Sequence, residues 1–82
     1  MSGGITEAHV AQAEAWLVEH GHSLAGIAHP EGHQGRMMAS IALELNVPAF
    51  SNPDTATLLV GLIAYKHSGG RVVTAAVREA GL

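Results

Sequence analysis

The sequence has no cysteine, one lysine and three aromatic side chains in 82 residues. Without cysteine the chain cannot form the disulfide framework that stabilises many small secreted domains, so we expect a cytoplasmic protein. The residues after Met1 offer neither a basic segment nor a long apolar one, so no secretory signal is predicted. Because disulfides are excluded, support beyond the hydrophobic core would have to come from a metal ion or from self-association.

The chain also lacks a long apolar run and an excess of positive charge, and both absences limit the partners that it is expected to bind. The longest apolar run, residues 55–65, covers 11 residues, whereas a membrane-spanning helix needs roughly 20, so no membrane span is predicted. Four lysine and arginine side chains stand against seven acidic ones, and the net charge is −3. So few cations give a weak electrostatic footprint, and nucleic acid is not expected to be the main partner.

What the chain has in abundance is apolar side chains, which make up 48% of it. A chain of this length has room for one core, so residues 1–82 are expected to form one domain. The apolar spacing predicts an all-α bundle of three long helices, at about residues 7–20, 34–46 and 53–67. A short C-terminal helix is expected over residues 71–80, with a strand as the competing interpretation because Val72 and Val73 are β-branched.

Local signals mark where these helices begin. Thr6 is a predicted N-cap, Ser51 or Asn52 is another, and Pro53 suits a first helical turn because its missing N–H would have no partner there. Residues 21–35 hold four glycines, a proline and three histidines, which predicts a Gly/His-rich loop region. Within it, the apolar residues 24–28 could form either a helical turn or a short strand. Ser23 in this region is better explained as a helix cap than as a nucleophile. Residues 1–4 are expected to form a flexible tail.

Residues 55–65 (TATLLVGLIAY) are the most apolar segment. A helix that is apolar on nearly all sides cannot be covered by three short neighbours, so we expect a homodimer that buries this helix or the last one. Methionine adapts its shape to a partner, although Met37 and Met38 could instead fill gaps in the core. The interface candidates are Trp16, Met37, Met38, Leu58, Leu62, Ile63 and Tyr65.

Four histidines lie within fourteen positions, at His20, His22, His29 and His33. Neutral imidazole binds zinc or nickel, and a glycine-rich segment could fold these ligands around one ion. The competing interpretation is that they are solvent-facing loop residues, because structural zinc sites usually recruit cysteine and Pro30 breaks any helix that would join the last two. We expect no resident cofactor and keep zinc or nickel as the alternative.

A second alternative is a small helix-turn-helix protein that binds DNA through its C-terminal helix. The turn would be residues 68–70, and the contacts would come from the exposed side of the helix over residues 71–80. The candidate residues are Lys66, Arg71, Thr74 and Arg78. The competing interpretation is an ordinary solvated helix face whose cations favour the helix C-terminus.

No complete catalytic signature is present, since Ser23 and Ser40 lie in no nucleophile-elbow pattern and no glycine-rich segment is followed by the Lys-Ser/Thr pair of a phosphate loop. We therefore expect a non-enzymatic module that binds itself and an unidentified protein. Fourteen alanines and ten glycines beside one lysine are typical of GC-rich coding sequence. This composition suggests an inhibitor or modulator of a host protein, encoded by a high-GC bacterium or phage.

Overall fold

The computed structural model describes residues 4–81 and is all-α, with no strand in that range. This confirms the predicted fold class. Three helices are long and three helical segments are short: α1 (Glu7–Glu19), α2 (Leu24–Ile27), α3 (His33–Asn46), the 3-10 turn η1 (Pro48–Phe50), α4 (Pro53–His67) and α5 (Ala75–Glu79). Of the predicted tail, residues 1–3 lie outside the described residues.

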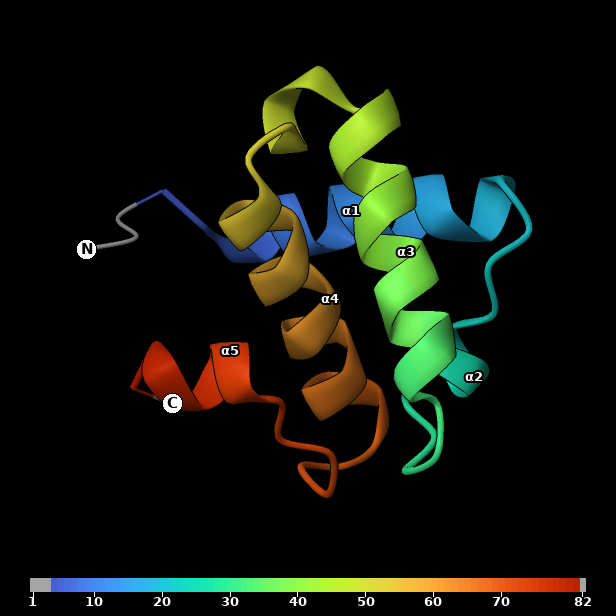
Figure 1. The fold of residues 1–82 in the computed structure, drawn as a ribbon, viewed down its shortest axis with the longest axis vertical. Coiled ribbons are helices and arrows are strands. Elements are labelled where there is room, and N and C mark those ends of the chain that lie inside the picture. The colour runs from blue at the N-terminus through green and yellow to red at the C-terminus, as the bar shows by residue number, and fades with distance from the viewer. Residues whose placement is uncertain (1–3, 82) are drawn as a thin grey trace.

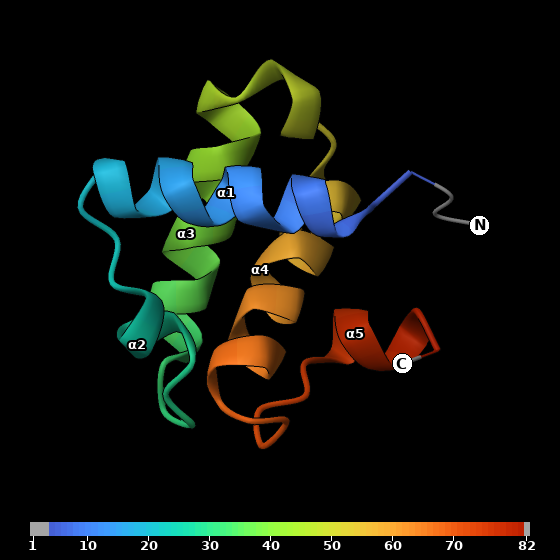
Figure 2. The ribbon, with the colours of Figure 1, turned by 180° about the vertical axis from the view of Figure 1, so that it is seen from behind.

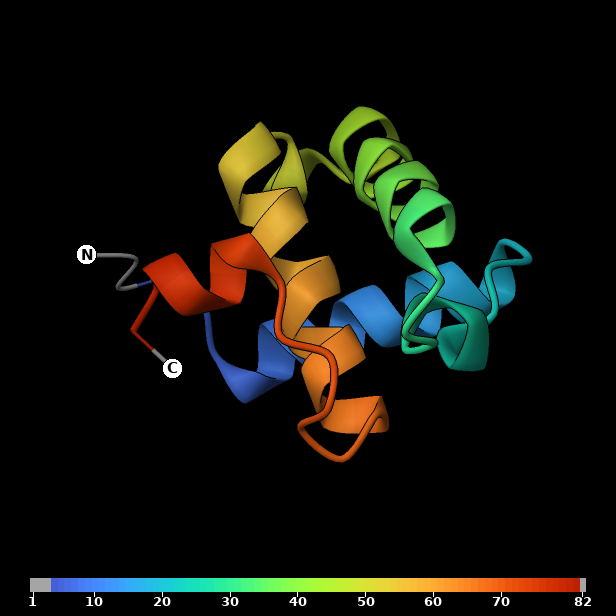
Figure 3. The same ribbon diagram turned by 60° about the horizontal axis from the view of Figure 1, so that its bottom comes forward.

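The helices pack in two crossed layers (Figure 1). α3 and α4 run side by side in opposite directions, and α1 crosses behind both of them; the view from behind shows α1 in front (Figure 2). α2 lies beside the beginning of α3, and α5 lies on the other side of α4 (Figure 3). α4 is therefore the central helix, with neighbours on several sides.

Polar side chains cap the beginnings of the helices, and most of these caps lie at the residues that the sequence predicted. Thr6 accepts a hydrogen bond from the backbone N–H of His9, and its own N–H donates to the His9 ring, which completes a capping box. Ser23 accepts from the N–H of Gly26 at the start of α2. Asn52, followed by Pro53, accepts from two amides at the start of α4.

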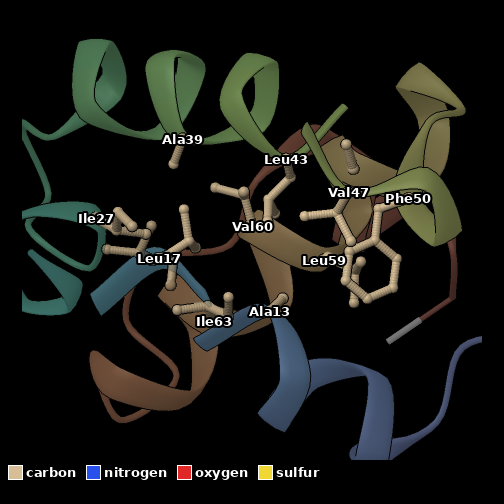
Figure 4. Packing of buried hydrophobic residues seen from close by; sticks show 13 residues of the cluster. Ala13, Leu17, Ile27, Ala39, Leu43, Val47, Phe50, Leu59, Val60 and Ile63 are labelled. Carbon is tan, nitrogen blue, oxygen red and sulfur yellow. The ribbon is translucent and has the colours of Figure 1, made fainter. Parts of the chain in front are cut away.

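The core is built around α4 (Figure 4). Leu59, Val60 and Ile63 of this helix are buried against Leu17 of α1 and Leu43 of α3. Full burial of each such side chain contributes about 1.5–3 kcal/mol. Alanines at the crossings keep the helix axes close. The other members of the cluster are Ala13, Ile27, Ala39, Val47, Phe50, Ala56, Ala64 and Val72.

The prediction that Ile63 contributes to a dimer interface is wrong, because this side chain is fully buried in the core of its own chain. Leu58 and Leu62 are half-buried, and only Tyr65 is exposed among these four candidates. The physical reason is the number of neighbours: α1, α2, α3, α5 and η1 all pack against α4. Other helices of the same chain therefore bury most of the apolar surface of α4 that was predicted to be buried in a dimer.

The structure also settles two segments that the sequence left open or misplaced. Within residues 21–35, residues 24–27 form the helical turn α2 rather than a short strand, and α3 begins at His33. The C-terminal helix begins at Ala75 rather than Arg71, because Thr74 has extended backbone angles and caps it by accepting from the N–H of Val77. Val72 and Val73 before it are neither helix nor strand.

Candidate functional site

The largest concentration of exposed apolar side chains lies on α3. Met37 is 49% exposed, Met38 56%, Ile41 47% and Leu45 74%. Met37, Ile41 and Leu45 follow one another at intervals of four residues, so they form a continuous row along the helix, and Met38 lies beside it. We call these four residues the α3 stripe.

The stripe is exposed because α3 turns a different side to the core. Ala39 and Leu43 are its fully buried residues, and they face α4 (Figure 4). Ala39 is small, which allows α3 to approach α4 closely. The alternative that Met37 and Met38 fill gaps in the core is therefore wrong.

A groove runs beside the stripe, between α3, α4 and α5, and has a volume of about 450 Å³. Met37 and Ile41 of α3 line one side, Val60 and Gly61 of α4 lie between, and α5 contributes Ala75 and Ala76. Polar groups of His33, Arg36, Ser40, Glu44, Thr57 and Thr74 also line it. A groove that combines apolar side chains with polar groups is typical of a surface that receives another molecule.

Short contacts hold the groove in shape. The hydroxyls of Ser40 and Thr57 lie 3.1 Å apart and join α3 to α4 by a hydrogen bond. On the other side, Gly61 has no side chain, so Thr74 and Val77 can approach the backbone of α4 closely.

Arg36 fixes the start of α3. Its guanidinium nitrogen Nη1 donates to the carbonyl oxygens of Ile27 and His29, at 2.8 and 2.7 Å. These carbonyls belong to the end of α2 and the turn after it, so one side chain ties both to α3. This role of Arg36 could not be predicted from the sequence, because backbone acceptors leave no pattern in a sequence.

The four histidines proposed as metal ligands do not converge. His20 stacks on Trp16 with ring centroids 3.9 Å apart, and its Nδ1 lies 2.8 Å from the carbonyl oxygen of Trp16. His29 accepts from the N–H of Glu31 through Nδ1, while His33 lines the groove. Within residues 4–81, no group of three or more His, Cys, Asp or Glu side chains is placed to hold a metal ion.

Two of the four histidines, His20 and His22, lie beside the one tryptophan instead. His22 is also stacked on Trp16, with ring centroids 6.4 Å apart. Trp16 itself is half-buried and packs against the core from α1. This interface candidate thus has one part of its ring covered by imidazole and another by the core.

The residues of the DNA-binding alternative do not share a helix face. Arg71 precedes α5, and Thr74 is its N-cap. Arg78 lies on α5 and donates to the carbonyl oxygen of Val73, while Lys66 lies near the end of α4 and pairs with Glu14. The five-residue α5 is too short to present the predicted row of contacts.

Glu14 joins α1 to the end of α4. Its carboxylate lies 2.7 Å from Nε2 of His67 and 3.2 Å from Nζ of Lys66. Desolvation acts to raise the pKa of Glu14, but the hydrogen bonds from His67 and Lys66 and their charges outweigh it, so the pKa lies below its ordinary value. The geometry is that of a structural ion pair between two helices.

No family model, curated protein or solved structure matches this chain. Within residues 4–81, none of the helices combines the length and the apolar character needed to cross a bilayer. The α3 stripe and its groove are the surface feature that an account of function has to explain.

Proposed function

We propose that this chain is a non-enzymatic protein-interaction module that binds through the α3 stripe and the groove beside it. The observation that carries the proposal is that the four large apolar side chains of the stripe are exposed together on one helix. Single exposed apolar residues are ordinary, whereas a contiguous exposed group next to a groove marks an interaction surface.

The chemistry of the stripe supports this assignment. Two of its four members are methionines, whose flexible side chains fit irregular apolar surfaces. The helix below them is held rigidly, by Arg36 at its start and by the Ser40–Thr57 hydrogen bond in the middle. Because the backbone of α3 is already ordered, binding costs no backbone ordering entropy, and only the side chains of the stripe lose conformational freedom.

The process that this module serves is a further part of the proposal. The GC-rich composition and the small size support a protein of a high-GC bacterium or phage that modulates a host protein by covering part of its surface. The molecule that binds the stripe presents an apolar surface to it, such as one face of an amphipathic helix.

Site-specific photo-cross-linking in the producing cell tests the proposed function. A photoreactive amino acid replaces Ile41 in one variant and Val18, an exposed apolar residue on α1, in the matched control. We expect a discrete cross-linked protein adduct from position 41 and none from position 18. Equal cross-linking from both positions, or none from position 41, would contradict the proposal.

A further inference from the structure

We propose that the occupant of the α3 stripe is a second copy of this chain, whose α3 packs antiparallel to the first about a two-fold axis at Ile41. This inference rests on the proposed function, because it names the partner of the same surface. It follows from the symmetry of the stripe and from the charges beside it.

The stripe is complementary to itself in this orientation. Met37 and Leu45 lie four residues before and after Ile41, about 6 Å away along the helix axis in each direction. A two-fold axis at Ile41 therefore brings Met37 of each copy opposite Leu45 of the other, while the two Ile41 side chains meet on the axis. Such an isologous contact closes on itself and yields a dimer rather than a filament.

The charges select the antiparallel orientation. The first half of α3 carries Arg36 and no acidic residue, and the second half carries Glu44 and no basic residue. Both side chains line the groove, so they lie on the same flank of the stripe. An antiparallel neighbour places Glu44 of one copy near Arg36 of the other and opposes the two helix dipoles. A parallel two-fold would place these side chains on opposite flanks of the contact, so that Arg36 of one copy would face neither Glu44 nor Arg36 of the other.

Disulfide trapping tests the relative orientation of the two α3 helices. Native cysteines do not interfere, because the native chain has none. Helices in contact lie 8–10 Å apart, so only Cα atoms that face each other come within the ~7 Å that a disulfide spans. We expect the Ile41→Cys variant to form a disulfide-linked dimer under mild oxidation. Met37→Cys alone should form at least about tenfold less, since antiparallel packing separates its two copies by about 12 Å.

A mixture of Met37→Cys and Leu45→Cys chains completes the design. We expect a mixed disulfide between the two variants, and the Val18→Cys control should form no disulfide-linked dimer. Efficient self-linking of Met37→Cys would overturn the antiparallel arrangement. No dimer from Ile41→Cys at about 100 µM, a concentration that detects even weak association, would overturn self-association.

A separate measurement distinguishes failure of this inference from failure of the proposed function. Sedimentation equilibrium should give twice the mass of the chain for the native protein and the single mass for Ile41→Glu, with the helical circular dichroism unchanged. A native monomer whose position 41 still cross-links to another protein in cells would reject the second copy as the partner and leave the interaction module standing. A monomer with no cross-link would reject both.

Discussion

The helices α3 and α4 lie side by side and carry almost the same share of apolar residues, seven of 14 in α3 and eight of 15 in α4. Four of the large apolar side chains of α3 are nevertheless exposed, whereas Tyr65 is the one such residue on α4. The difference lies in their surroundings: the helices that pack against α4 surround it, whereas those that pack against α3 leave one of its sides exposed.

Apolar content thus identifies helices whose surface favours burial. The packing of the whole chain determines which of these helices is buried by other parts of the same chain. For α4 the cover is intramolecular, so its apolar side chains stabilise the fold. On α3 part of the apolar surface stays exposed, so the side chains of the α3 stripe are available to stabilise a complex. The following substitutions separate these two roles.

The largest contrast is between Ile63 and Leu45. Ile63→Ala removes methyl groups from a fully buried site on α4 and should lower the free energy of unfolding by about 3 kcal/mol, through lost transfer energy and a cavity. Leu45→Ala on α3 should change it by less than about 0.5 kcal/mol when the chain is monomeric. Urea denaturation of dilute samples measures both, and equal losses would contradict the assignment of the two helices.

The next contrast lies at the start of α3. A Cβ atom at Gly32 would overlap the carbonyl oxygen of Gly26 and lie 3.1 Å from that of His29. Gly32→Ala should therefore cost about 2 kcal/mol in the free energy of unfolding. Gly35→Ala, one turn further on and 4.0 Å from the nearest such atom, should stabilise the chain by about 0.5–1 kcal/mol because alanine favours helix. Thermal unfolding of both variants should show shifts of opposite sign.

A smaller effect is expected where α5 packs on α4. A Cβ atom at Gly61 would lie 2.9 Å from a methyl group of Val77 and closer still to the hydroxyl of Thr74. Gly61→Ala should displace α5 and narrow the groove, with a net loss of about 1 kcal/mol because the better helix propensity of alanine offsets part of the clash. Amide chemical shifts should change at residues 74–79; shifts confined to α4 would contradict this packing.

The smallest effect concerns the ion pair that joins α1 to α4. Because the folded-state pKa of Glu14 is lowered, its ionised form stabilises the fold above the ordinary glutamate pKa of about 4.3, and this contribution is lost as the pH falls through the lower folded value. Glu14→Gln should melt slightly below the native chain at pH 7. The two melting temperatures should converge under strongly acidic conditions, and a constant difference across this range would contradict the pairing.

Much of the fold could be predicted from local chemistry. Thr6, Ser23 and Asn52 cap helices as expected because capping depends on neighbouring residues alone. The start of α5 could not be placed as well, because the β-branched Val72 and Val73 weaken the helical pattern without excluding it. Thr74, which the sequence assigned to a helix face, was the local signal for the actual start.

The candidate site was harder to predict. Met37 and Met38 were identified as candidates, but Ile41 and Leu45 were not, since α3 carries two apolar rows and periodicity does not say which one faces inward. In the structure the row that contains Ala39 and Leu43 is buried, which leaves the other row exposed. The groove and the role of Arg36 depend on segments that only the folded chain brings together.

The most direct test of the central claim is carbene footprinting of the native protein, read residue by residue by mass spectrometry, in dilute solution and at high concentration. We predict heavy labelling of Met37, Ile41 and Leu45 in the dilute sample, their protection in the concentrated one, and negligible labelling of Leu59 and Ile63 in both. Strong labelling of Leu59 and Ile63, or an α3 stripe that is unlabelled when dilute, would contradict the account.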